Sequence, residues 1–200
     1  MKVGIVGAGK IGSALARHLT RSGNEVIVSN SRGPKSLEPL IAELGPRAKA
    51  GTVAEAAAAP VVFLTVTWAQ LPGALSRLPP WSGRIAVDTT NPFVADGAGL
   101  RLVDLGGKTS SEVVAGMVPG ARLVKAFNTL FYQVLASEPG QAGGRRVIFL
   151  SGDDAAAKGQ VSALIDQLGF AAVDLGGLVE GGRMHQAGGP LAGLNLVRLS

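Results

Sequence analysis

The sequence predicts an α/β fold in which helices cover both faces of a doubly wound, mostly parallel β-sheet of about eight strands, followed by a small C-terminal appendage. Short apolar runs that suit buried strands alternate with helical patterns along most of the 200 residues. The run 61–65 (VVFLT) is unbroken, as expected of a strand that is covered on both faces. A glycine-rich turn joins the first strand to the first helix. Together these features indicate a sheet of the Rossmann type.

The first strand-to-helix turn contains the most informative motif of the chain. An apolar run at 3–6 ends in G-A-G-K-I-G and passes directly into a helical pattern that continues to Gly23. In a dinucleotide-binding fingerprint the first glycine makes the tight turn, the second lets the backbone approach a pyrophosphate, and the third lets the helix pack close to the sheet. The free N–H groups of the helix then bind the pyrophosphate. The motif predicts a dinucleotide site, with a purely structural glycine turn as the alternative, at Gly7, Ala8, Gly9, Lys10, Ile11 and Gly12.

The residues after the second strand, Glu25 to Ser29, indicate which dinucleotide is bound. An NAD site places an acidic residue about 20 residues beyond the glycines, where it accepts hydrogen bonds from the ribose. Here the strand is followed by N-S-R-G-P-K, which contains no acid. A guanidinium can pair with a 2′-phosphate and stack on adenine. NADP is therefore favoured over NAD, with a solvated basic turn as the alternative. The candidate contacts are Asn30, Ser31, Arg32 and Lys35.

The remaining elements follow from apolar periodicity and from the residues that end each run. Gly45-Pro46 stops a helix at 37–44. Thr109 and Glu112 form the capping-box pattern that opens a helix ending at Met117, and Asp153 is expected to cap a later helix that runs to about Leu168. We further expect strands at 47–51, 84–88, 123–126, 146–150 and 171–174, helices at 52–59 and 71–78, irregular structure at 93–108, and an interrupted tail from 178.

Polar residues follow the two central strands, and ligands of open α/β sheets bind outside the carboxyl ends of the strands. The strand at 61–65 leads into Thr65-Val66-Thr67-Trp68, and the strand at 84–88 is followed by Thr90 and Asn91. Trp68 either walls the nicotinamide side of the site or packs on the core. Thr90 and Asn91 either bond the carboxamide or the ribose of the cofactor, or form an Asn-Pro turn that needs no ligand.

Composition excludes several classes of function. The chain has no cysteine, which excludes disulfides, thiolate metal sites and a cysteine nucleophile. No apolar run approaches 18 residues, and no signal peptide is recognisable before the first strand, so we expect a cytoplasmic protein without a membrane span. The net charge of +5 comes from scattered basic residues with few aromatics, which favours small phosphorylated ligands over nucleic acid.

The two histidines do not suggest hydrolytic chemistry. His18 lies on the helix face away from Ala16 and Leu19, so we expect it to be exposed. His185, in the tail, is either structural or in contact with substrate. No spacing of histidine, aspartate or glutamate indicates a metal site, and no Ser-His-Asp arrangement is recognisable.

Five segments together resemble the NADPH:coenzyme F-420 oxidoreductase family: GIVGAGKIGSALA, SNSRGP, DTTNPF, KAFNTL and LSGDD. Members of this family move hydride between NADP(H) and a 5-deazaflavin, and the cytoplasmic domains of STEAP-type ferric reductases belong to the same wider group. The resemblance extends from Met1 to about Leu178. The tail departs from it, because the last helix of the family usually runs unbroken whereas this tail is interrupted by glycines.

The resemblance implies a role for each matching segment. It places the pyrophosphate on Gly7–Gly12, the 2′-phosphate on Ser31, Arg32 and Lys35, and the nicotinamide end near Thr65–Trp68 and Thr90–Asn91. It puts Asn128 and Thr129 beside the ring that takes the hydride, and it implies a homodimer. We therefore expect an NADP-binding domain at 1–178 and a helical tail at 179–200 that completes the acceptor site or a dimer contact.

Hydride transfer requires little side-chain chemistry, because the cofactors carry the reactivity and the protein supplies orientation and exclusion of water. The missing catalytic histidine, cysteine or carboxylate pair is therefore compatible with it. Three functions remain open at this stage. They are NADP-dependent transfer to coenzyme F-420, the same chemistry with a flavin or a ferric chelate as acceptor, and a non-catalytic NADP(H)-binding sensor.

Overall fold

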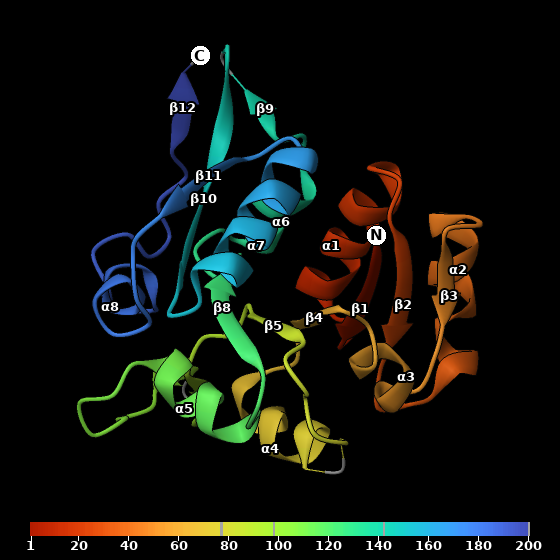
Figure 1. Cartoon of the computed structure of the whole chain (residues 1–200), viewed down its shortest axis with the longest axis horizontal. Helices are drawn as coiled ribbons and strands as arrows, with labels where there is room; N and C mark the ends of the chain where they lie inside the picture. Colours follow the sequence, from red (N-terminus) through yellow and green to blue (C-terminus); the bar gives the residue numbers. More distant parts are fainter. Residues whose placement is uncertain (77, 98, 142, 200) are drawn as a thin grey trace.

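The computed structural model describes residues 1–76, 78–97, 99–141 and 143–199. The sequence predictions for 71–78, 93–108 and 179–200 each include one residue outside these ranges, namely Arg77, Ala98 and Ser200. Within the described ranges the chain forms a ten-stranded sheet and a separate two-stranded hairpin. In Figure 1 the main path of the sheet runs from β11 on the left to β3 on the right, in the order β11-β10-β8-β5-β4-β1-β2-β3.

Six neighbouring strands of this path are parallel, as the sequence predicts. The β10 strand runs antiparallel to β8 and parallel to β11, and its first residues also pair with the short strands β9 and β12. The bounds are β1 Lys2–Val6, β2 Glu25–Ser29, β3 Ala48–Ala50, β4 Val61–Leu64, β5 Ile85–Asp88, β8 Arg122–Ala126, β9 Gly140–Gln141, β10 Gly144–Gly152, β11 Ala171–Asp174 and β12 Val197–Leu199.

Helices cover both faces of the sheet, because successive side chains of each strand point to opposite faces. Val61 and Phe63 of β4 pack into the core under α1, α2, α6 and α7, while Val62 and Leu64 pack into the core under α3, α4 and α5. The bounds are α1 Lys10–Arg21, α2 Glu38–Leu44, α3 Val53–Ala57, α4 Leu71–Leu75, α5 Ser110–Met117, α6 Tyr132–Ala136 and α7 Ala155–Gln167, with 3₁₀ turns η1 Pro34–Leu37 and η2 Trp68–Gln70. The predicted doubly wound architecture is confirmed.

The capping box of α5 is confirmed, but the cap of α7 was assigned to the wrong aspartate. The backbone N–H of Glu112 donates to Thr109 Oγ1 (3.2 Å), and Glu112 accepts from the N–H of Thr109 (2.7 Å). The N-cap of α7 is Asp154, whose Oδ1 accepts from the N–H of Ala157 at 2.7 Å. Asp153 instead accepts from the N–H of Leu178 (2.8 Å) and so anchors the start of the tail.

Two further predictions were wrong, the first for a local hairpin and the second for packing between segments that are far apart in the sequence. The segment 93–108 is not wholly irregular, because β6 Phe93–Ala95 and β7 Leu100–Leu102 form an antiparallel hairpin. His18 is buried rather than exposed: α6 packs against its helix face, and His18 Nε2 lies 2.7 Å from the carbonyl oxygen of Leu135. The ring also meets Phe170 edge to face.

The glycines that interrupt the tail are needed for close packing. Helix α8 (Glu180–His185) lies against β10 (Figure 1). A Cβ on Gly181 would sit 2.6 Å from the carbonyl oxygen of Leu175 and 2.9 Å from the Cβ of Ser151. Glycine therefore lets α8 approach the sheet more closely than any other residue would. Among the helices within the described ranges, none has the length and apolarity that a membrane crossing requires.

Candidate functional site

A cavity of about 720 Å³ opens at the carboxyl edge of the sheet. Its walls are the turn after β1, the loop after β2, the segment after β4, and residues of α3 and α4. This is the edge at which ligands of open α/β sheets bind. The sequence-predicted residues that line the cavity are Gly7, Ala8, Gly9, Asn30, Ser31, Arg32, Thr65, Val66 and Thr67.

The three fingerprint glycines differ in what surrounds them. Gly7 has φ +114°, and a Cβ there would lie 2.8 Å from the backbone of Thr65. A Cβ on Gly12 would overlap the carbonyl oxygen of Gly7 and lie 2.7 Å from Thr65 Oγ1. Around Gly9, no atom of the described residues lies within 4 Å of such a Cβ. The first and third glycines are thus required by the protein's own packing, whereas the second leaves open space beside the cavity.

The loop after β2 is held by its own side chains and presents a cation to the cavity. Asn30 Oδ1 accepts from the N–H of Arg32 (2.9 Å), and Asn30 Nδ2 donates to Ser36 Oγ (2.9 Å). Among the residues in the described ranges, none forms an ion pair or hydrogen bond with the Arg32 guanidinium. Arg32 therefore offers a free guanidinium to an anion in the cavity. Lys35, in η1, is exposed and lies outside the lining of the cavity.

Four other predicted contacts from these segments also lie outside the cavity lining, namely Lys10, Ile11, Gly12 and Trp68. Lys10 Nζ sits 4.3 Å from the centre of the Tyr132 ring, a cation–π contact across α1 and α6. Ile11 packs half-buried against the core. Trp68 packs against the core beneath α4, which agrees with the core alternative of the two considered for it.

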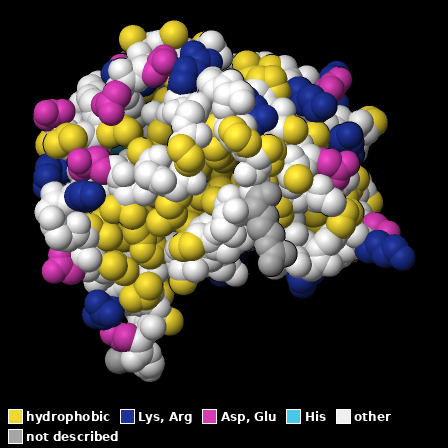
Figure 2. Space-filling view, turned by 60° about the horizontal axis from the view of Figure 1, so that its bottom comes forward, with side chains coloured by type: hydrophobic (Ala, Val, Ile, Leu, Met, Phe, Trp, Pro, Cys, Tyr) yellow, Lys and Arg dark blue, Asp and Glu magenta, His cyan; other side chains and the backbone are white. Residues whose placement is uncertain are grey.

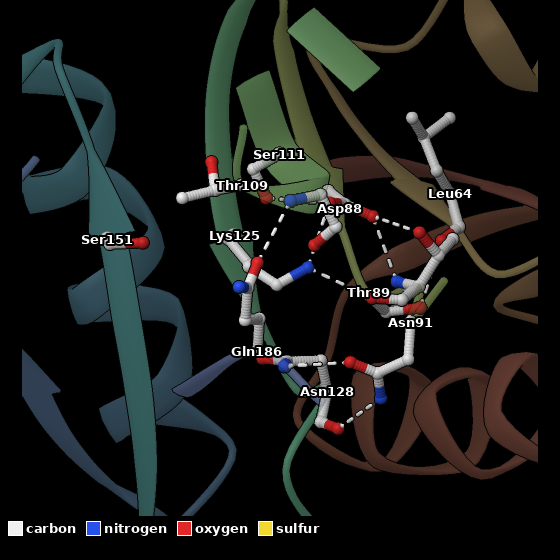
Figure 3. A network of polar contacts seen from close by, with 12 residues as sticks. Leu64, Asp88, Thr89, Asn91, Thr109, Ser111, Lys125, Asn128, Ser151 and Gln186 are labelled. Carbon is white, nitrogen blue, oxygen red and sulfur yellow. Dashed lines mark hydrogen bonds and ion pairs between the residues drawn. The ribbon is translucent and has the colours of Figure 1, made fainter. Parts of the chain in front are cut away.

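A second polar group of residues joins the carboxyl ends of β5 and β8 (Figure 3). Asn91 Nδ2 donates to the backbone oxygen of Asn128 (2.8 Å), and Asn128 Nδ2 donates to Asn91 Oδ1 (3.3 Å) and to the backbone oxygen of His185 (2.7 Å). The carbonyl oxygen of Thr129 accepts from the N–H of Gly193 (3.1 Å). Within the described part of the chain, Asn128 Oδ1 is buried without a partner. The predicted Asn128 and Thr129 are thus brought next to Asn91 and covered by the tail.

The hydroxyl group of Thr90 is engaged inside the protein. Thr90 Oγ1 donates to Asp88 Oδ1 at 2.7 Å, and the N–H of Thr90 donates to the same oxygen at 2.9 Å. Thr90 is buried, so its side chain holds the turn after β5 and is not directed at the open cavity. Asn91, the next residue in the chain, is half-buried.

Sequence reasoning missed the buried charges behind these loops. Asp88 and Lys125 are both 0% exposed, and Lys125 Nζ lies 3.0 Å from Asp88 Oδ2. Burial alone would raise the pKa of the Asp88 carboxyl, but Lys125 and the hydrogen bonds from Thr90 and Ser111 hold it below its ordinary value. The signal was available: Asp88 is the charged last residue of the apolar strand IAVD, and Lys125 is a charged residue within the apolar segment LVKA.

His185 is a second buried polar group at this edge. It is 0% exposed, and its Nε2 lies 2.9 Å from Ser151 Oγ. Burial, together with the nearby charge of Lys125, lowers the pKa of His185 to about 3, against the opposing effect of Asp88. The imidazole is therefore neutral at physiological pH and unsuited to act as an acid there. Within the described ranges, no group of three or more His, Asp or Glu side chains could hold a metal ion.

The pKa of His185 predicts a loss of stability in mild acid. Its folded-state pKa of about 3 lies below the ordinary value of 6.5, so its contribution is fully present above pH 6.5 and is lost as the pH falls toward 3. Between pH 8 and pH 5 we expect the free energy of unfolding to fall by about 2 kcal/mol. Urea unfolding at both pH values measures this change.

The control for this measurement is His185→Asn, which keeps a polar group opposite Ser151 but cannot take up a proton. The variant should show a smaller fall over the same interval. Some fall should persist, because burial also lowers the pKa of His18. Equal slopes for the variant and the parent protein would contradict the role of His185.

Comparison with known proteins gives the following similarities. The sequence profile of the family described as NADP oxidoreductase coenzyme F420-dependent matches residues 2–92. A crystal structure of a hypothetical protein from Sinorhizobium meliloti is 44% identical, with a TM-score of 0.93, and the match covers 99% of this chain and 96% of that one. A candidate F420-dependent NADP reductase from Arthrobacter sp. FB24 is 28% identical, with a TM-score of 0.74 and coverage of 89% and 86%.

A longer relative matches as well. Metalloreductase STEAP3 of Rattus norvegicus is 32% identical over 178 residues, which is 88% of this chain but 34% of the relative. The chain thus spans about a third of the length of that protein.

Proposed function

We propose that the chain is a member of the family of coenzyme F420-dependent NADP oxidoreductases, whose profile matches residues 2–92, and that it transfers a hydride between NADP(H) and a 5-deazaflavin of the coenzyme F-420 type. The observation that best supports this proposal is the cavity at the carboxyl edge. It combines open space beside Gly9 with the free guanidinium of Arg32. A pyrophosphate fits the first feature and a 2′-phosphate the second.

The donor groups that line the cavity fit the pyrophosphate and the 2′-phosphate of NADP(H). The turn Gly7–Gly9 and the N-terminus of α1 would hold the pyrophosphate, and Ser31 with Arg32 would hold the 2′-phosphate. From there the dinucleotide would extend along the carboxyl edge toward Asn91 and Asn128. The side chain of Asn91 bonds Asn128 through both its nitrogen and its oxygen, so the two residues offer a fixed polar surface to the nicotinamide end.

An apolar surface beside these amides supports a flat ring as the hydride acceptor. The β6–β7 hairpin follows Asn91 directly, and its Phe93, Leu100 and Leu102 are exposed. Leu102 lies against Gly188 of the tail, where a Cβ would be 3.3 Å from its Cδ1. Figure 2 shows hydrophobic side chains gathered over the face at the bottom of Figure 1. An aromatic ring system would bury part of this apolar surface, whereas a hydrated ferric ion would not.

In this mechanism the bound nicotinamide supplies the hydride, and the chain supplies geometry. Holding two rings with their reacting carbons about 3–3.5 Å apart accounts for much of the acceleration that such a reaction needs. The neutral His185 and the buried Asp88 and Lys125 stay out of reach of the rings, because none of the three has exposed surface. The tail over Asn128 and Thr129 keeps water away from this end of the site.

The second candidate is an NADPH-dependent flavin or ferric reductase, which the 32% identity to a metalloreductase favours. The third candidate is a non-catalytic sensor, which binds NADP(H) without turnover. All three would use the same cavity and the same Arg32. They differ in the acceptor, which the assay below is designed to identify.

The test is a turnover assay of the purified protein with NADPH as donor and with oxidised coenzyme F-420, FMN and a ferric chelate as separate acceptors. We expect bleaching of the deazaflavin with NADPH and little with NADH. Turnover with FMN or ferric chelate alone would favour the second candidate. Tight NADPH binding without any turnover would favour the sensor, and the absence of NADPH binding would contradict all three.

A further inference from the structure

The buried pair Asp88–Lys125 calls for an explanation beyond stability. Taking two charges out of water is unfavourable, and an apolar pair of similar size often stabilises a protein as well or better. Both side chains lie on the sheet face covered by α5, where the neighbouring positions Ala86 and Leu123 are ordinary core residues. The pair therefore replaces core packing directly behind the loops that carry Asn91 and Asn128.

Asp88 and Lys125 together form hydrogen bonds with every polar group of one residue, Thr90. Asp88 Oδ1 accepts from the backbone N–H of Thr90 (2.9 Å) and from Thr90 Oγ1 (2.7 Å). Lys125 Nζ donates to the backbone oxygen of Thr90 at 2.9 Å. The backbone donor, the backbone acceptor and the hydroxyl are thus fixed from two different strands. Few conformations of the turn at 88–91 satisfy all three bonds.

The conformation of the turn at 88–91 also determines where the Asn91–Asn128 amide pair lies. Asn91 follows Thr90 in the chain, and its side chain bonds Asn128 through both its nitrogen (2.8 Å) and its oxygen (3.3 Å). Lys125 lies in β8, and Asn128 follows two residues after the end of that strand. One ammonium group therefore sits between the end of β5 and the end of β8, and Figure 3 shows it directed at Asp88 and the following turn.

The same cluster also secures α5 and the tail. Ser111 Oγ donates to Asp88 Oδ2 (2.8 Å), which ties the start of α5 to the pair. The N–H of Ser110 donates to Gln186 Oε1 (2.9 Å), and the N–H of Ala187 donates to Asn91 Oδ1 (3.2 Å). The tail that covers Asn128 is thus bonded to elements whose positions depend on Asp88.

We propose that Asp88 and Lys125 are positioning residues for hydride transfer, acting through Thr90 and the Asn91–Asn128 amide pair to orient the ring at the nicotinamide end. They touch no ligand themselves, because neither has exposed surface. The inference rests on the proposed function for its catalytic readout. It has a separate readout in the emission of bound NADPH, which reports how tightly the nicotinamide ring is held.

The main test is the double variant Asp88→Asn/Lys125→Met, which removes both charges together and leaves no buried charge unpaired. We expect NADPH and adenosine 2′,5′-bisphosphate, which has no nicotinamide, to bind within about threefold of the parent protein, because the adenosine half of the site is untouched. We expect kcat to fall about a hundredfold, the effect of misplacing a reacting group by roughly an ångström. The emission of bound NADPH should move toward that of free NADPH.

Two further variants control for folding and for general effects of removing a charge pair. Thr90→Val keeps the shape of the side chain but removes one donor to Asp88, and it should lower kcat about tenfold at unchanged affinity for adenosine 2′,5′-bisphosphate. Lys158→Met/Asp174→Asn removes a 3.0 Å ion pair at the surface and should leave kcat and emission unchanged.

The outcomes distinguish a failure of the positioning role from a failure of the proposed function. A folded double variant or Thr90→Val with parental kcat and parental NADPH emission would overturn the positioning role. If the parent protein binds NADPH but reduces no acceptor, the proposed function fails, and the emission difference alone decides the positioning role. A double variant that does not fold leaves Thr90→Val to decide it.

Discussion

Replacing Arg32 with alanine is expected to weaken NADPH binding about ten- to a hundredfold and to leave NADH binding nearly unchanged. The guanidinium lines the cavity, and within the described residues it has no ion-pair partner to lose. The variant thus removes a single charged hydrogen bond to the 2′-phosphate, worth about 1.5–3 kcal/mol. The stability of the free protein should not change.

Fluorescence titration with both dinucleotides measures this effect. Arg47→Ala is the matched control, because Arg47 lies before β3 at the opposite edge of the sheet and bonds the backbone oxygen of Gly23. It should alter neither affinity. Equal losses for NADPH and NADH in Arg32→Ala would contradict the assignment of Arg32 to the 2′-phosphate. A loss in Lys35→Ala of similar size would move part of that role to Lys35.

Alanine at Gly9 and alanine at Gly12 should have opposite consequences, although the two glycines lie three residues apart. A Cβ at Gly9 meets no atom within 4 Å, and the backbone there has φ −77°, which alanine adopts readily. Gly9→Ala should fold normally and lose about ten- to a hundredfold in NADPH affinity, since the methyl group occupies the approach of the pyrophosphate.

Gly12→Ala should instead destabilise the protein. Its Cβ would overlap the carbonyl oxygen of Gly7, which is backbone and cannot swing aside. Overpacking of this kind costs about 1–3 kcal/mol, and each kcal/mol lowers Tm by about 2–4 °C in a domain of this size. Thermal unfolding without ligand separates the two variants. Similar Tm values for Gly9→Ala and Gly12→Ala would show that the turn has more room than the geometry indicates.

The local signals of the sequence were sufficient to predict three of the segments that line the cavity. The turn at Gly7–Gly12, the loop at Asn30–Arg32 and the segment at Thr65–Thr67 each follow a strand that is legible from its own residues. Parallel pairing then brings these three segments to one edge without further information. The parallel pairing of six neighbouring strands agrees with the mostly parallel sheet that the sequence predicts.

The polar group around Asn91 and Asn128, which we propose for the nicotinamide end, could be predicted only in part, because it depends on contacts between distant segments. Asn91 and Asn128 were recognised, but the bonds that join them to His185 and Ala187 span 57 and 96 residues. His18 was placed on the wrong side of its helix because α6, which covers it, begins 114 residues later. A lone lysine in an apolar strand predicts a partner, but no local pattern identifies that partner as Asp88.

The uneven spacing of these contacts along the chain has a consequence for the order of folding. Residues that line the cavity come from the first 78, and the strands beside it pair within this same part of the chain. The polar group at Asn91 and Asn128 also requires the late segment 185–193, whose bonds to these two residues span 57 and 96 residues. Contacts of long sequence separation form slowly. If the chain binds NADP(H) as proposed, refolding would therefore restore the binding site for the adenosine half before the site for the nicotinamide ring, through an intermediate that binds the dinucleotide but does not turn it over.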